Sequence, residues 1–305
     1  MTNKELIIAN AIGANGFTTD DTTAGHINPE YWNRQLLRYL EPNLVIANKA
    51  AVYDDILGQD GASFKVTIDA TPTAAAAVDE SDDIPVTAFE TTSQVVFTPT
   101  EYAKAYQLSD KQARRGFFDA MANMTMKLGF ALALGRDDAA EALLRTGAGN
   151  SIVANGVDSS DLASSDTLSY DDIVDAVKEL RKDLFVARYL FVSPEGFAQL
   201  AKDQNFKFVN HAGTDETLRD GRIGTIYGLT VYETTQIGVD DNASKAIVLG
   251  TDQIGFPVFG IGRKLLPQLR TQAWALGRYT DVAAVEEWDM KILRADGICT
   301  IEHYA

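Results

Sequence analysis

Residues 70–85 are the stretch that most constrains how this chain can fold. They contain two prolines, an alanine run and an acidic cluster, and almost no bulky side chain that could anchor them in a core. Alternating apolar and polar residues on either side, at 64–68 and less cleanly at 93–97, predict two strands. A connection this long inside a compact domain is usually functional or disordered. We therefore expect an extended hairpin arm that lies on a neighbouring molecule, because a two-stranded hairpin is marginally stable alone.

Residues 109–144 predict one helix of unusual length. Ser109 and Gln112 have the spacing of a capping box, and apolar residues then recur at steps of three and four as far as Leu132. Arg145 and Gly147 are typical of a helix end. Such a helix spans about 50 Å. Its Met and Phe stripe is interpreted as core packing.

The remaining elements indicate an α+β fold. A polar arm to about residue 28 precedes a helix that opens at Asn28 and Pro29 and stops before Pro42. A Ser, Asp and Gly-rich linker is expected over 150–166. It is followed by a helix capped by Ser169 and Asp172 that extends to Leu184. Strands are predicted at 188–192, 222–232 and 245–249 and within 265–304, with a short helix from 194. These elements do not follow a strict βαβ rhythm.

The charge and cysteine content exclude several classes of protein. A net charge of -16 and a pI near 4.6 argue against a nucleic-acid-binding surface, which needs clustered Lys and Arg. Solubility alone could also account for the acidity. Cys299 is the only cysteine, so the chain has no disulfide framework, zinc ribbon or Cys-X-X-Cys motif. We also expect neither a signal peptide nor a membrane-spanning segment.

No catalytic, cofactor or metal site is predicted. The three histidines have no nucleophile or metal ligand at a recognised offset, and both the Gly-X-Ser-X-Gly and His-Glu-X-X-His patterns are absent. Glycines in 147–149 and 260–264 are interpreted as turns. The acidic cluster 79–83 could bind a divalent cation but lacks the spacing of an EF-hand, so a solvated loop tip is favoured. Asp137 and Asp138 beside Arg136 favour an ion pair, within the chain or between subunits, over acid-base catalysis.

The order of these elements resembles the major capsid proteins of tailed viruses, which have the Hong Kong 97 fold. The stretches that carry the resemblance are Asn-Pro-Glu-Tyr-Trp at 28–32, Glu-Tyr-Ala-Lys-Ala-Tyr-Gln-Leu-Ser-Asp at 101–110, Ala-Leu-Ala-Leu-Gly-Arg-Asp-Asp-Ala-Ala at 131–140 and Gly-Thr-Ile-Tyr-Gly-Leu-Thr-Val-Tyr at 224–232. They are similar to the lead-in helix, the return from the hairpin, the apolar end of the spine helix and a glycine-bounded strand pair of that family.

The resemblance implies a division of the chain. An N-terminal arm and lead-in helix would occupy 1–58, and the extended hairpin 59–103. A peripheral domain with the spine helix would occupy 104–186, and an axial domain 187–290. A C-terminal strand, 291–305, would return to the peripheral domain. The axial domain would meet its copies around hexamer and pentamer centres.

The resemblance also implies a function and partners. Identical copies would assemble in the host cytoplasm into an icosahedral virion shell around double-stranded DNA, without sequence-specific binding and without a membrane. Separate scaffolding and portal proteins are expected, and the presence of cement proteins is left open. Inter-subunit contacts are predicted between acidic groups of the hairpin, such as Asp82 and Asp83, and Arg114, Arg115 and Arg136 of the spine.

One device of the family is missing. Some members join their subunits through an isopeptide bond from a hairpin lysine to an asparagine of the next subunit. No lysine lies between Lys65 and Lys104 here, so the resemblance implies a non-covalent shell. The rival functions are an encapsulin, a nanocompartment shell of the same fold, and an enzyme whose site is assembled from scattered residues.

Overall fold

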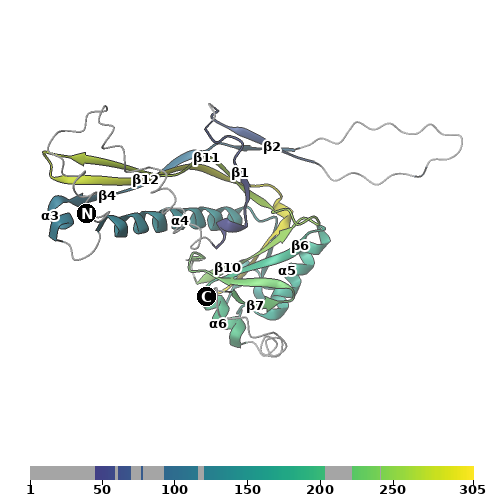
Figure 1. Ribbon diagram of the computed structural model, residues 1–305. Coiled ribbons are helices and arrows are strands. Elements are labelled where there is room, and N and C mark those ends of the chain that lie inside the picture. The colour runs from purple at the N-terminus through teal and green to yellow at the C-terminus, as the bar shows by residue number, and fades with distance from the viewer. Residues whose placement is uncertain are drawn as a thin grey trace.

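A computed structural model describes residues 45–58, 61–69, 77, 93–115, 120–202, 222–240 and 242–305 of the chain. The described strands form a four-stranded sheet, a seven-stranded sheet and a two-stranded hairpin, with a long helix beside the first sheet (Figure 1). The predicted polar arm, the helix opening at Asn28 and nearly all of the segment between the hairpin strands lie outside the described residues.

The helices, in chain order, are the short 3-10 helix η3 (Ala47–Lys49), α3 (Asp110–Arg115), α4 (Ala120–Thr146), η4 (Ala154–Gly156), η5 (Ser159–Asp161), α5 (Tyr170–Lys182), α6 (Pro194–Lys202) and η6 (Ala295–Gly297). The strands are β1 (Ala51–Tyr53), β2 (Phe64–Ile68), β3 (Ser93–Phe97), β4 (Thr100–Ser109), β5 (Asn150–Val153), β6 (Val186–Val192), β7 (Arg222–Ile226), β8 (Leu229–Glu233), β9 (Val239–Asp240), β10 (Ala243–Thr251), β11 (Phe259–Trp274), β12 (Tyr279–Ile292) and β13 (Ile298–Tyr304).

The four-stranded sheet has the order β1-β11-β12-β4. Strand β1 runs parallel to β11, and the other neighbours are antiparallel. The register of β11 against β12 shifts between Arg263 and Leu265 and again between Leu265 and Gln268. Pro267 lies within this irregularity, where its missing N–H costs no ladder hydrogen bond. The long β11–β12 hairpin is therefore divided into two regular halves.

The seven-stranded sheet has the order β5-β13-β10-β6-β8-β7, and β9 pairs with β10. Helix α5 packs beside it (Figure 1) and begins with the predicted capping box, in which Ser169 and Asp172 satisfy each other's backbone N–H groups. Its buried face continues into the strands as one core, which includes Ile173, Val177, Leu180, Leu190, Val248 and Ile301. The predicted strands at 188–192, 222–232 and 245–249 are confirmed as β6, β7–β8 and β10.

The predicted long helix is confirmed over 120–146 as α4, whose 27 residues span about 40 Å. Its predicted start is wrong, because Ser109 ends strand β4 and does not cap α4. The short helix α3 precedes it, and residues 116–119 between them lie outside the described part. Leu128, Leu132 and Ala133 of α4 pack on Val282 and Ala284 of β12. Further along, Ala140 and Leu144 belong to the core under the seven-stranded sheet. One helix therefore contributes to both cores, and this part of the predicted stripe is core packing.

The structure differs from the sequence prediction at the expected linker and at the end of the helix predicted to extend to Leu184. Residues 150–153, predicted as linker, form β5, which pairs in parallel with β13. Leu184, the predicted last residue of this helix, lies beyond the end of α5 with a φ of 65° and is exposed. The C-terminal strand β13 pairs with β10 and β5 in the seven-stranded sheet, while β11 and β12 belong to the sheet that covers the spine helix.

Candidate assembly surfaces and the junction behind them

A buried ion pair joins α4 to β12 where the two cores meet. The Arg136 guanidinium donates from Nε to Glu286 Oε1 at 3.1 Å and from Nη2 to Glu286 Oε2. Trp288 Nε1 also donates to Glu286 Oε1, at 2.6 Å. Burial raises the pKa of the Glu286 carboxyl, and the charge and hydrogen bonds of Arg136 partly oppose that rise. The pair fixes α4 along β12, since a buried charge that lost its partner would be strongly destabilising.

Asp137, the next residue of α4, holds the segment at which the described chain begins. Its carboxylate accepts hydrogen bonds from the backbone N–H groups of Val45 and Ala47, both at 3.0 Å. Burial raises the pKa of Asp137, and these backbone hydrogen bonds oppose the rise. Because Arg136 and Asp137 are adjacent in α4, their side chains point in different directions. Arg136 contacts β12, and Asp137 contacts the backbone of residues 45–47.

The β2–β3 hairpin is rooted on the four-stranded sheet by aromatic side chains. Phe64 and Phe97 stack with ring centroids 4.8 Å apart, and Tyr53 lies 5.6 Å from Phe97. A Cβ at Gly262 of β11 would lie 2.5 Å from the Phe64 ring, so only glycine allows this approach. The two strands pair antiparallel from Phe64–Phe97 to Ile68–Ser93. The predicted hairpin strands are thus confirmed, and their root is fixed.

Exposed apolar residues gather at the turn of the β11–β12 hairpin. Trp274 and Leu276 are both exposed, and the Trp274 ring lies 6.2 Å from that of Tyr279. Trp274 Nε1 donates to Asp281 at 2.9 Å, which orients the indole. An oriented aromatic side chain with an open face is a frequent anchor of protein interfaces. This turn is therefore a candidate contact between subunits.

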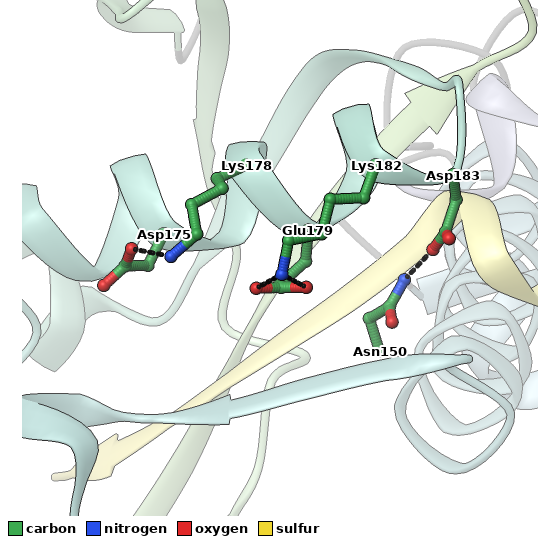
Figure 2. A network of polar contacts seen from close by, with 6 residues as sticks. All are labelled: Asn150, Asp175, Lys178, Glu179, Lys182 and Asp183. Carbon is green, nitrogen blue, oxygen red and sulfur yellow. Dashed lines mark hydrogen bonds and ion pairs between the residues drawn. The ribbon is translucent and has the colours of Figure 1, made fainter.

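Polar groups on α5 are satisfied within the chain. Figure 2 shows Lys178 beside Asp175 and Lys182 beside Glu179, with N···O distances of 3.0 and 2.7 Å. Asn150 of β5 donates to Asp183 at 2.8 Å, which ties the end of the helix to the edge of the sheet. Exposed pairs of this kind contribute at most about 1 kcal/mol. These pairs therefore stabilise the exposed face of α5 only weakly.

Of the predicted contact residues, the structure describes the side chain of Arg136 alone. Asp82 and Asp83 lie outside the described residues. Arg114 and Arg115 are in α3, and nothing is described of their side chains. Arg136 is buried and paired with Glu286 of its own chain, which corresponds to the ion pair within the chain that its acidic surroundings allowed. Sequence reasoning missed Glu286, which has no distinctive neighbour in the sequence and lies 150 residues away.

The described residues include no group of three or more His, Cys, Asp or Glu side chains placed to hold a metal ion. A polar hollow of about 750 Å³ lies near the end of α4, with Arg145, Ser159, Lys245 and Glu302 in its lining. Three of its polar side chains contact one another. Ser159 Oγ donates a hydrogen bond to Glu302 at 2.9 Å, and Lys245 Nζ lies 3.4 Å from the same carboxylate. This hollow therefore presents a satisfied polar network.

Two reactive residue types are buried in the seven-stranded sheet. Burial raises the pKa of the Cys299 thiol to about 12, so the thiolate is scarce at neutral pH. Burial also lowers the pKa of His303, partly opposed by its hydrogen bond to the Tyr304 carbonyl. Both side chains are closed to solvent.

Among the helices of the described residues, none is long and apolar enough to cross a membrane.

Solved structures of viral and cellular shells have the same fold. The capsid of cyanophage Pam1 matches with a TM-score of 0.68 and 11% identity, over 88% of this chain and 92% of that one. Mycobacterium phage Che8 matches with a TM-score of 0.62 and 18% identity, over 85% and 90%. An encapsulin complex of Synechococcus elongatus matches with a TM-score of 0.57 and 8% identity, over 97% and 94%. These likenesses confirm the predicted Hong Kong 97-type fold.

The sequence comparison supplies the family. No curated protein matches the sequence. Residues 90–304, however, match the family described as phage capsid protein. The matched residues include α3 and α4, both sheets apart from β1, and strand β3. A match over well over half of the chain shows membership, and it agrees with the predicted recognition and with a structural role in the virion capsid. This chain belongs to the phage capsid protein family, whose members are structural proteins and not enzymes.

Proposed function

We propose that this chain is the major capsid protein of a tailed virus and that its copies close into an icosahedral shell of hexamers and pentamers around double-stranded DNA. The observation that carries the proposal is the family match over both sheets and the long helix. The rooted β2–β3 hairpin supports it, because two strands without a core of their own need a surface on another molecule. Contacts of that heterologous kind propagate into closed assemblies.

The two sheets correspond to the two domains of such a subunit. The peripheral domain comprises α4 and the sheet β1-β11-β12-β4, and the axial domain comprises the seven-stranded sheet with α5 and α6. This division follows strand pairing, so it assigns 259–292 to the peripheral domain and the C-terminal strand β13 to the axial domain. The hexamer and pentamer centres are then formed by the axial domain.

The charge of the chain suits a container for DNA. A subunit with a net charge of -16 repels phosphate groups, so the packaged DNA slides over the wall and leaves it without specific binding. Assembly in the host cytoplasm fits a chain with one buried cysteine and no disulfide. Scaffolding and portal functions are assigned to separate proteins.

The hairpin contact is proposed to involve Asp82 and Asp83 of one subunit and Arg114 and Arg115 of the next. It is tested by reversing the charges at Arg114 and Arg115 to Glu and measuring the yield of shells. We expect the yield to fall and to recover when Asp82 and Asp83 are also changed to Lys. Unchanged assembly of the Arg variant would contradict the pairing.

An encapsulin is the second candidate, and the likeness to the Synechococcus elongatus encapsulin complex favours it as far as fold is concerned. The membership of the phage capsid family places the viral proposal first. The two differ in contents, because a capsid encloses nucleic acid and an encapsulin encloses protein. A neighbouring portal or terminase gene, as opposed to one for a peroxidase or a ferritin-like enzyme, also separates them.

The experiment is size-exclusion chromatography of the purified chain, followed by negative-stain electron microscopy. Shells, tubes, or free hexamers and pentamers are the expected products, and nuclease-protected DNA is expected inside virus-derived particles. Protein cargo without DNA would select the encapsulin. A chain that stays monomeric at every salt concentration, and also with the scaffolding protein added, would contradict the proposed function.

A further inference from the structure

The outward side of α4 carries an apolar stripe that the described chain leaves open. Met126, Phe130 and Leu134 are spaced by four residues and are 42%, 52% and 36% exposed. Residues at this spacing lie on one face of a helix. The opposite side packs on the four-stranded sheet through Leu128 and Leu132, so the sheet does not cover the stripe. Exposed apolar side chains contiguous along one helix mark a docking face.

The face that carries the stripe is covered again one turn further along α4. At 100° per residue, Asp137 lies between the directions of Met126 and Leu134 around the helix axis. There Asp137 binds the N–H groups of Val45 and Ala47, and Ala47 is buried. The described chain therefore begins on this face, immediately beside the stripe.

The residues that directly precede this anchor have a matching pattern. Trp32, Leu36, Leu37 and Leu40 recur at helical spacing in the segment 29–41. Leu40 is five residues from Val45, a link that reaches up to about 17 Å. Phe130 lies seven residues from Asp137, about 10 Å along the helix axis. A segment tethered this closely has a millimolar effective concentration at the stripe, which favours it over a second copy.

We propose that residues 29–41 of the same chain form an amphipathic helix that docks its Trp32–Leu40 face on Met126, Phe130 and Leu134. The helix completes a core on the outward side of α4 and fixes where residues 1–28 leave the subunit. Asp137 holds the linker between the two helices. This role is independent of the contents of the shell.

Cysteine pairs in the full-length chain test the docking, because the natural Cys299 is buried and does not compete. In the double variant Leu37→Cys/Phe130→Cys, mild oxidation is expected to give a disulfide within one chain. The matched control is Leu37→Cys/Ala142→Cys, since Ala142 is exposed at a similar distance from Asp137 along α4 but points about 140° away around the helix. The control is expected to stay reduced under the same conditions.

Trypsin gives a second measurement, because Arg34 and Arg38 lie inside the segment. Phe130→Asp removes one large apolar contact, so cleavage at these arginines should accelerate about tenfold, while Ala142→Asp leaves it unchanged. Circular dichroism checks that each variant is folded. A disulfide formed only between chains, seen as a dimer on a non-reducing gel, would overturn the proposal in favour of a second copy. A disulfide no more frequent than in the control would overturn the docking itself.

Discussion

The buried Arg136–Glu286 pair provides the sharpest test of how α4 is held on its sheet. In Glu286→Gln the amide keeps the size of the side chain, and Trp288 Nε1 can still donate to its oxygen. The amide nitrogen, however, faces the Arg136 guanidinium, so two donors meet and the buried positive charge loses its counter-ion. Removing one partner of a buried pair costs about 3–5 kcal/mol.

This cost should be measurable as a fall in melting temperature. One kcal/mol shifts the midpoint of a chain of 305 residues by roughly 1.5–2 °C, so we expect Glu286→Gln to melt about 5–10 °C below the natural chain. The matched control is Glu287→Gln. Its carboxylate lies 3.6 Å from Lys264 in a partly exposed pair, which is worth at most about 1 kcal/mol.

The assay is thermal unfolding of the unassembled subunit, followed by circular dichroism, because assembly would add its own stabilisation. A third variant, Arg136→Met/Glu286→Leu, replaces the pair by apolar groups and should recover part of the loss, because the buried Trp288 Nε1–H also loses Glu286 as its acceptor. Equal melting of Glu286→Gln and Glu287→Gln would refute the reasoning. It would mean that water or a rearranged side chain reaches the Arg136 charge.

The further predictions concern two glycines, His303 and the assembled particle. Gly262→Ala should destabilise the hairpin root by about 1–3 kcal/mol, because its Cβ would lie 2.5 Å from the Phe64 ring. Gly135→Ala on α4, where a Cβ meets nothing within 4 Å, should stabilise the chain slightly. Urea unfolding of the two glycine variants measures both changes in stability. Burial lowers the pKa of His303, so its contribution to stability is complete above about pH 6.5 and is lost as the pH falls below that value. Denaturation at pH 7.5 and 5 should show this loss, and His303→Gln should remove most of the difference. Mature particles should give only monomer on a denaturing gel, because the chain has no lysine between Lys65 and Lys104; a ladder of multimers would contradict the non-covalent shell.

The elements that could be predicted from the sequence are those with a local signal. The capping box at Ser169 and Asp172 and the apolar periodicity of α4 depend on residues three or four apart, and both are confirmed. Strand β5 escaped prediction because Asn-Ser-Ile-Val has no alternation of its own. It becomes a strand only through parallel pairing with β13, nearly 150 residues later. Pairings over such separations leave no local trace.

The interpretation of charged residues shows the same limit. Arg136 next to Asp137 and Asp138 looks like a surface charge cluster in the sequence. In the structure Arg136 contacts Glu286 of β12 and Asp137 contacts the backbone of Val45. Both side chains are therefore buried and hydrogen-bonded. The sequence contains no hint that Glu286 is the partner. The direction of a charge on a helix can be predicted only when the position of the neighbouring sheet is known.

Helix α4 connects the cores of the two sheets. Its first half packs on Val282 and Ala284 and its last turns enter the core of the seven-stranded sheet, while Arg136 and Asp137 lie at the transition. The irregularity of β11 at Arg263–Gln268 faces β12 at Glu287, next to the buried pair. A continuous helix resists bending, whereas a bulged pair of strands bends easily. If the subunit occupies both hexamers and pentamers, as proposed, the adjustment is more readily made by the bulge and the hairpin root than by α4. The buried ion pair then keeps the helix in register while the strands beside it bend.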